Sequence, residues 1–80
     1  MTNEEKYLNA FKEVLNVSDK QISSLTYQGV QNWDSVGHMA LIAELEEIFD
    51  IMMDTDDIID FSSYNKGIEI LSTKYNVEFK

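Results

Sequence analysis

The sequence predicts an all-α fold: a small four-helix bundle with three longer helices, one short helix and a long first loop. Apolar residues recur at helical spacing in three separate segments, and no segment shows the strict alternation typical of a strand. The chain has 80 residues, 44% of them hydrophobic, which suffices for one packed domain but not for two. We therefore expect a single domain over residues 1–80, with helices at about 3–16, 35–50, 56–60 and 63–75.

The first helix has a clear start signal. Thr2 is followed three residues later by Glu5, which is the form of a capping box. A stripe of apolar residues then follows at helical period and predicts the face that enters the core: Tyr7, Leu8, Phe11, Val14 and Leu15.

Periodicity fades between Val17 and Trp33, where turn-forming residues are frequent. We expect a short helical turn near residues 19–23, and then a loop that lies across the bundle. Trp33 is expected to anchor this loop rather than to bind a substrate, because aromatic residues dominate burial in small cores. Gly29 is expected to adopt a backbone conformation that other residues avoid. The side chains available for packing are Ile22, Leu25, Tyr27, Val30 and Trp33.

The second long helix is predicted to begin at Ser35, with Asp34 as its N-cap residue. Ser35 would then lie in the first turn, where free N–H groups and the helix dipole favour a nearby phosphate. One face of this helix is predicted to enter the core, and it comprises Leu41, Ile42, Leu45, Ile48 and Phe49. The other face suits docking to partner proteins, although a helix buried on two sides is the alternative. That docking face comprises Val36, Met39, Ala43, Glu46, Glu47 and Asp50.

The last third of the chain predicts a short helix and then a longer one. Asp54 or Thr55 can cap the short helix, and Ser62 or Ser63 the last helix, where Gly67 would allow close helix contact. We expect Ile58, Ile59 and Phe61 to seal the bundle. The apolar stripe of the last helix is Tyr64, Ile68, Leu71 and Tyr75, with Asn76 at its end and residues 77–80 as a loosely held tail.

Charge and composition exclude several functional classes. Acidic residues number 15 against 6 lysines, and no basic residue lies between Lys20 and Lys66, so binding to nucleic acid or to anionic lipid is disfavoured. Cysteine is absent. The polar start of the chain argues against a signal peptide, and no apolar run approaches the roughly 20 residues of a membrane helix. We expect a cytoplasmic monomer without stable membrane insertion.

The tripeptide Asp34-Ser35-Val36, at the head of an acidic helix near the middle of the chain, resembles the acyl carrier protein family. The resemblance extends over nearly the whole chain in length, acidity and element order, and it implies a bundle of acyl-carrier type. It also implies that Ser35 is esterified by 4′-phosphopantetheine from coenzyme A, and that Asp34 helps to present Ser35. The terminal thiol of this arm would carry acyl or aminoacyl groups as thioesters.

The resemblance implies partners as well. They are a phosphopantetheinyl transferase, an acyl-loading ligase or acyltransferase, and a downstream synthase or transferase. Fatty-acid-synthesis carriers typically continue the motif as Asp-Ser-Leu-Asp, whereas Val36-Gly37-His38-Met39 follows here. This sequence is more similar to that of dedicated carriers of polyketide, peptide, aminoacyl or surface-polysaccharide pathways. The cargo stays open among these pathways and fatty acid synthesis.

Three other hypotheses concern Ser35 with His38, the acidic run from Asp54 to Asp60, and the chain as a whole. Ser35 and His38 invite a nucleophile and base interpretation, but the chain offers little material for an oxyanion site, so we expect no catalytic residue and no enzyme, with His38 as a packing residue. The carboxylates from Asp54 to Asp60 lack the central Gly of a calcium loop, so no metal site is expected. The alternative to a carrier is an unmodified acidic helical module that binds a basic partner.

A pocket for an acyl chain is expected between the second long helix and the short helix. Met52 and Met53 follow the second long helix in the chain. Their unbranched side chains are adaptable and could line such a pocket, or could simply fill gaps in the core.

Overall fold

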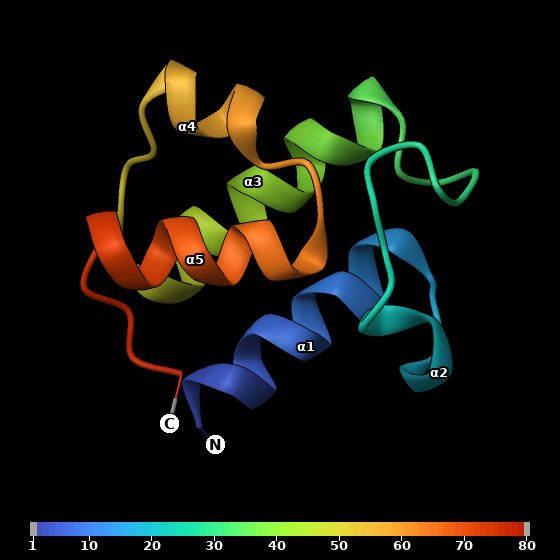
Figure 1. The fold of residues 1–80 in the computed structure, drawn as a ribbon, viewed down its shortest axis with the longest axis horizontal. Helices are drawn as coiled ribbons and strands as arrows, with labels where there is room; N and C mark the ends of the chain where they lie inside the picture. The colour runs from blue at the N-terminus through green and yellow to red at the C-terminus, as the bar shows by residue number, and fades with distance from the viewer. Residues whose placement is uncertain (1, 80) are drawn as a thin grey trace.

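The computed structural model describes residues 2–79, and within that range the chain forms five helices (Figure 1). The predicted all-α fold is confirmed. The single extended pairing in residues 2–79 is an isolated antiparallel bridge between Thr26 and Ser63. The helices are α1 (Asn3–Leu15), α2 (Asp19–Ile22), α3 (Ser35–Phe49), α4 (Thr55–Asp60) and α5 (Tyr64–Lys74).

These bounds agree with the predicted helices to within one or two residues, and the expected turn near residues 19–23 is α2. The predicted caps explain the agreement. The Thr2 hydroxyl accepts a hydrogen bond from the Glu5 amide at 3.1 Å, and the Glu5 carboxylate accepts one from the Thr2 amide at 3.2 Å. Ser63, one of the two proposed caps of α5, accepts a hydrogen bond from the amide of Lys66 at 2.9 Å.

The core is built around a cluster of large aromatic side chains. Phe11 lies at its centre, with ring centroids 4.9 Å from Tyr7, 4.9 Å from Tyr64 and 5.4 Å from Trp33. The Tyr7 hydroxyl donates a hydrogen bond to the Tyr64 carbonyl at 2.7 Å and thereby joins α1 to α5. Burial raises the pKa of Tyr7 well above its ordinary value, so the hydroxyl stays a donor at physiological pH.

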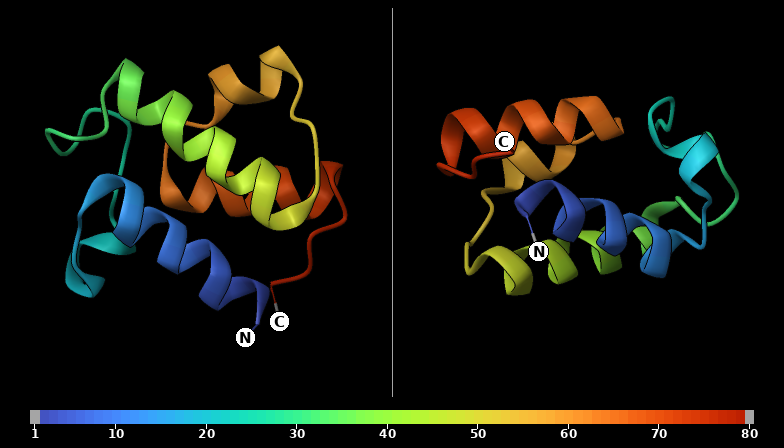
Figure 2. Two further views of the ribbon diagram at one scale, coloured as in Figure 1. Left: turned by 180° about the vertical axis from the view of Figure 1, so that it is seen from behind. Right: turned by 90° about the horizontal axis from the view of Figure 1, so that it is seen from below.

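The helices surround this core as the ribbon shows from three directions (Figures 1 and 2). α1 packs along α3. In the view of Figure 1, α1 and α4 lie at opposite ends of the molecule, with α5 between them. The predicted stripes face inward. From them the structure buries Tyr7, Phe11, Leu15, Leu41, Ile42, Leu45, Tyr64 and Leu71 and half-buries Leu8, Val14, Ile48, Phe49, Ile68 and Tyr75. Ile70 is also buried, which the single-stripe interpretation of α5 missed.

Gly67 allows the close contact predicted for it. A Cβ atom at this position would lie 2.1 Å from the Tyr7 hydroxyl and 2.3 Å from Phe61 Cζ. Both distances are far below van der Waals contact, so only glycine lets α5 approach the aromatic cluster this closely.

The prediction for Gly29 was wrong. Its backbone does not have a positive φ, and the neighbouring Gln28 has φ of 65° instead. Gly29 is required for space, because a Cβ atom there would lie 2.7 Å from the Thr26 hydroxyl oxygen and 2.9 Å from the Thr26 carbonyl oxygen.

The prediction of a loosely held tail was wrong for residues 77–79, while Lys80 lies outside the described residues. Asn76 has φ of 57° and turns the chain back, so that the Val77 amide donates to the Leu71 carbonyl at 3.1 Å. Val77 is buried, and the ring of Phe79 packs 5.2 Å from that of Tyr7. The apolar residues 77 and 79 hold the tail against the bundle.

Asp57 has a structural role that its place in an acidic run concealed. Its carboxylate is buried and accepts hydrogen bonds from Lys74 Nζ and from the Tyr75 hydroxyl, both at 2.6 Å. The Tyr75 hydroxyl in turn accepts from the Asp54 amide at 2.9 Å. These contacts fasten α4 to the end of α5, and the hydrogen bond from Lys74 is the main reason that the pKa of Asp57 is lowered.

Candidate functional site at the start of α3

The long loop before α3 is fixed to two other elements. On one side, the Tyr27 amide donates to the Ser62 carbonyl at 2.8 Å and the Tyr64 amide donates to the Leu25 carbonyl at 3.0 Å. On the other side, the Asn32 side-chain amide donates to the Leu15 carbonyl at the end of α1 at 3.0 Å. The start of α3 therefore has a defined position, although a loop precedes it.

Leu25 and Trp33 pin this loop as predicted. Leu25 is 4% exposed and Trp33 is fully buried, with its ring against Phe11. Trp33 is an anchor, since a side chain with no exposed surface offers nothing to a substrate.

Gly37 lets the loop return close to the first turn of α3. A Cβ atom at Gly37 would lie 1.9 Å from the Asn32 carbonyl oxygen, which is a backbone atom that cannot swing aside. Any other residue at this position would push the loop away from the helix. Sequence reasoning noted Gly37 only as a departure from a motif, because its partner is a loop carbonyl that periodicity does not place.

Ser35 is the first residue of α3 and its side chain is exposed. Asp34 caps the helix as predicted, because its carboxylate accepts a hydrogen bond from the Gly37 amide at 2.8 Å. The amides of Ser35 and Val36 precede the first residue that can donate within the helix, so they have no acceptor in α3 itself. An exposed hydroxyl thus lies beside unsatisfied donors at the positive end of a 15-residue helix.

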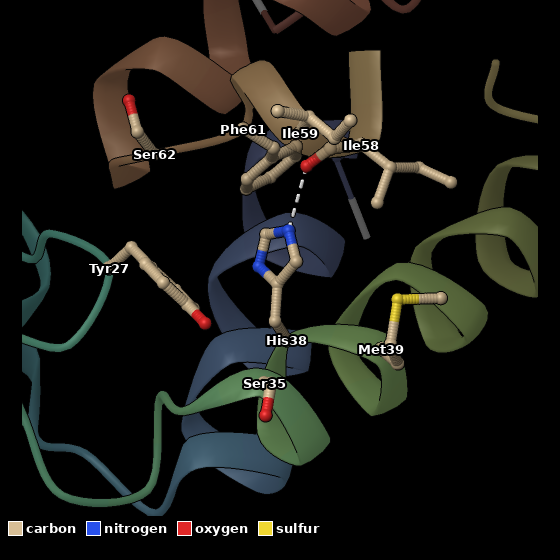
Figure 3. Close-up of a pocket in the computed structure, with 8 residues that line it drawn as sticks. All are labelled: Tyr27, Ser35, His38, Met39, Ile58, Ile59, Phe61 and Ser62. Carbon is tan, nitrogen blue, oxygen red and sulfur yellow. Dashed lines mark hydrogen bonds between the residues drawn. The ribbon is translucent and has the colours of Figure 1, made fainter. Parts of the chain in front are cut away.

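His38 is bonded at both ring nitrogens. Trp33 Nε1 donates to His38 Nδ1 at 2.9 Å, and His38 Nε2 lies 2.8 Å from the Ile58 carbonyl oxygen (Figure 3). Because an indole only donates and a carbonyl only accepts, the ring is neutral with its proton on Nε2. Neither nitrogen is free to take a proton from Ser35, and the packing role predicted for His38 is confirmed.

A pocket of about 330 Å³ opens between the start of α3 and α4. Figure 3 shows its walls, with Met39 on α3 across from the isoleucines of α4 and Tyr27 on a third side, while Ser35 lies at the edge with its hydroxyl directed away from α4. The lining residues are Ser35, His38 and Met39 from α3, Ile58 and Ile59 from α4, Phe61 and Ser62 after α4, and Tyr27 from the long loop. A pocket at this place was predicted.

Neither Met52 nor Met53 lines this pocket. Met53 is 7% exposed and belongs to the core, which confirms for this residue the alternative of filling a gap there. Met52 lies in the α3–α4 connection with 87% of its surface exposed, so neither interpretation holds for it. The prediction that Ile59 would seal the bundle was wrong, since it is 71% exposed and faces the pocket; Phe61 is buried and Ile58 half-buried. The register of a six-residue helix decides which of two adjacent isoleucines faces inward, and composition does not reveal it.

The predicted docking face of α3 is exposed, so the alternative of a helix buried on two sides is wrong. Val36 and Met39 are 78% and 53% exposed, and Ala43, Glu47 and Asp50 are exposed as well. Glu46 is half-buried, and its carboxylate accepts a hydrogen bond from the Met53 amide at 2.9 Å. Glu46 therefore also braces the connection that leaves α3.

The acidic residues around α4 do not gather into a metal site. Among residues 2–79, no group of three or more histidine, cysteine or carboxylate side chains is arranged to hold a metal ion. The one buried carboxylate of α4, that of Asp57, is already bonded to Lys74 and Tyr75.

Among residues 2–79, no helix is long and apolar enough to cross a membrane. Comparisons of the chain with protein-family models, with curated proteins and with solved structures found no match.

Proposed function

We propose that this protein is a carrier of acyl-carrier type, in which Ser35 bears a 4′-phosphopantetheine arm and delivers thioester-bound intermediates to biosynthetic enzymes. The observation that carries the proposal is the position of Ser35: an exposed hydroxyl on the first residue of a capped helix, at the edge of an apolar pocket. The motif Asp34-Ser35-Val36, which resembles that of the acyl carrier family, supports it.

The attachment step would be a phosphoryl transfer from coenzyme A. The Ser35 oxygen attacks the phosphorus that bears pantetheine, forming a new P–O bond, and the bond from that phosphorus to the bridging oxygen breaks. Adenosine 3′,5′-bisphosphate leaves, and the serine proton passes to a base on the transferase. Asp34 holds the first turn in place through Gly37, and the two free amides at positions 35 and 36 favour the phosphate that remains.

The exposed face of α3 would dock the partner enzymes, which are the transferase, a loading ligase or acyltransferase, and an unloading synthase or transferase. Val36 and Met39 offer apolar contact next to the attachment point, and Glu47 and Asp50 lie farther along the same face. The formal net charge of −9 attracts basic partner surfaces, and Glu47 and Asp50 place two of the negative charges on this face. His38, with both nitrogens bonded, keeps the protein chemically inert toward its own thioester.

Intact mass measurement tests the proposal. The protein is coexpressed with a broad-specificity phosphopantetheinyl transferase, and we expect a gain of about 340 Da, the formula mass of the added group. The Ser35→Ala variant should show no gain, and Ser23→Ala, which alters an exposed serine elsewhere, should gain as the wild type does. No gain in the wild type, or an equal gain in Ser35→Ala, would reject the carrier function in favour of an unmodified interaction module.

A further inference from the structure

The hydrogen bonds of His38 are compatible with only one protonation state of its ring. An indole nitrogen always donates, so His38 Nδ1 must accept from Trp33 Nε1, at 2.9 Å. A carbonyl always accepts, so Nε2 must donate to the Ile58 oxygen, at 2.8 Å (Figure 3). A doubly protonated imidazole donates at both nitrogens, so it keeps the bond to Ile58. At Nδ1, however, two N–H groups would face each other, and the bond to Trp33 would be lost.

The surroundings of His38 also disfavour a positive charge. The side chain is 9% exposed, and three aromatic rings lie around it, with centroids 5.2 Å away for Tyr27, 6.0 Å for Phe61 and 6.2 Å for Trp33. Tyr27 is the one titratable side chain among them. Burying a charge without a partner of opposite charge is costly.

The carboxylates of the neighbouring elements do not pair with the ring. Among residues 2–79, no ion pair includes His38. The carboxylate of Asp34 caps α3, and that of Asp57 on α4 is bonded to Lys74. The other carboxylates of α4 are exposed, and they are Asp56 and Asp60. A proton taken up at Nδ1 would therefore place an unpaired charge in the core.

The bond at Nδ1 is the one that ties Trp33 to α3. Trp33 is fully buried and directly precedes Asp34 and Ser35 in the chain. The backbone hydrogen bonds of Trp33, from the Gln28 amide and to the Val30 carbonyl, stay within the loop. Losing the indole bond would thus loosen the loop at the point where it leads into Ser35.

We propose that His38 is a pH-sensitive latch: when Nδ1 takes up a proton, Trp33 is released from α3, while the bond to Ile58 of α4 stays in place. Histidine is the side chain whose ordinary titration lies between about pH 5 and 8, and this chain has a single histidine. Mild acidification thus raises the population in which the loop beside Ser35 is loose. The latch needs no arm on Ser35, so it stands or falls independently of the carrier function.

The direction of the pH effect follows from the proton balance. The latched form holds a neutral ring, whereas a ring released from Trp33 titrates as an ordinary imidazole does, near about pH 6.5. The released form binds more protons, so the latch weakens as the pH falls through that value. From about pH 7.5 to about pH 5.5, the released population should rise about tenfold.

Nuclear magnetic resonance of the unmodified full chain tests the latch, because one tryptophan and one histidine give single indole and imidazole signals. The protection factor of Trp33 Nε1–H against hydrogen exchange should fall about tenfold from about pH 7.5 to about pH 5.5, while helical circular dichroism stays constant. The nitrogen signals of His38 should show, at about pH 7.5, a proton on Nε2 alone. A protection factor that stays within about twofold, one that falls only in step with the helical signal, or a proton on Nδ1 overturns the proposal.

Two variants assign the effect to the imidazole. His38→Gln removes the titrating group and keeps a side-chain amide, so the protection factor of Trp33 should no longer depend on pH over this range. Tyr27→Phe removes the other titratable side chain against the ring, and it should keep the tenfold fall. A fall that persists in His38→Gln, or that vanishes in Tyr27→Phe, overturns the proposal. Should His38→Gln not fold, the protection factor and nitrogen signals of the wild type decide alone.

Discussion

Trp33 donates its indole hydrogen bond to His38 at 2.9 Å, so the anchor of the long loop and the first turns of α3 hold each other inside the core. The same imidazole donates onward to the Ile58 carbonyl of α4 at 2.8 Å. One side chain thus connects three elements around the pocket: the loop, the helix that bears Ser35, and the helix that forms the opposite wall.

Replacing His38 should therefore lower the free energy of unfolding by more than the loss of its packing contacts alone. His38→Ala leaves the buried Trp33 N–H and the Ile58 carbonyl without partners, and we expect the free energy of unfolding to fall by about 2–4 kcal/mol. Urea denaturation followed by Trp33 fluorescence measures this loss. Met52→Ala, at an exposed position, should change stability by no more than about 0.5 kcal/mol. A loss of stability below about 1 kcal/mol in His38→Ala would show that the hydrogen bonds of His38 to Trp33 and Ile58 contribute little.

Gly37→Ala should destabilise the protein, although the same change in an exposed helix usually stabilises it by about 0.5–1 kcal/mol. The added Cβ would collide with the Asn32 carbonyl, so we expect a loss of about 1–3 kcal/mol. The rate at which a transferase modifies Ser35 should fall too, because the first turn must shift.

Ala40→Gly is a suitable comparison for Gly37→Ala, since Ala40 is exposed on the same helix. It should lose about 1 kcal/mol through helix propensity alone and leave the modification rate unchanged. A gain in stability for Gly37→Ala would mean that the loop accommodates a methyl group with little strain.

The Asp57 carboxylate should make stability depend on pH in the acid range. Hydrogen bonds from Lys74 and Tyr75 lower its pKa below the ordinary value of 3.8, so its contribution is complete above that pH and is lost as the pH falls through the lowered pKa. We expect the free energy of unfolding of Asp57→Asn to fall less steeply than that of the wild type below about pH 4.

Asp56→Asn provides the matched control for Asp57→Asn. It removes the same charge from an exposed neighbouring position in α4, and it should keep the wild-type acid dependence. Equal slopes for all three proteins would show that Asp57 titrates alike in the folded and unfolded chain.

Millimolar Mg²⁺ should raise the melting temperature by about 2–5 °C, because 15 acidic residues against 6 lysines leave a formal net charge of −9. Divalent cations screen this self-repulsion without requiring a specific site. The measurement is a thermal melt by circular dichroism, with NaCl at equal ionic strength as reference. An unchanged or lower melting temperature would count against self-repulsion as a significant term.

The helices and their caps could be predicted because the signals are local. Thr2 and Glu5 are three residues apart, and so are Asp34 and Gly37, and these short spacings fix the cap geometry. The role of Asp57 could not be predicted, because its partner Lys74 is 17 residues away and three neighbouring aspartates look the same in sequence. The tail was misjudged for a similar reason: Phe79 packs on Tyr7 at the far end of the chain.

At the candidate site, the position and exposure of Ser35 and the packing role of His38 followed from sequence. The identity of the pocket walls did not, because it depends on how α4 is rotated about its axis. The hydrogen bond from His38 to the Ile58 carbonyl and the anchoring of Asp57 set that rotation, and both cross between elements. These contacts place Ile59 on the pocket side of α4. Sequence periodicity could not predict this, because a helix of six residues is too short to show a clear apolar face.

The antiparallel pair between Thr26 and Ser63 has a consequence for biosynthesis of the chain. During translation, the loop that positions Ser35 cannot acquire this partner until the ribosome has synthesised and released residues well beyond α3. A nascent polypeptide halted before Ser63 would hold the serine in a segment without its final geometry. Under the proposed carrier function, installation of the arm would therefore be a post-translational event that follows folding of the C-terminal third of the chain.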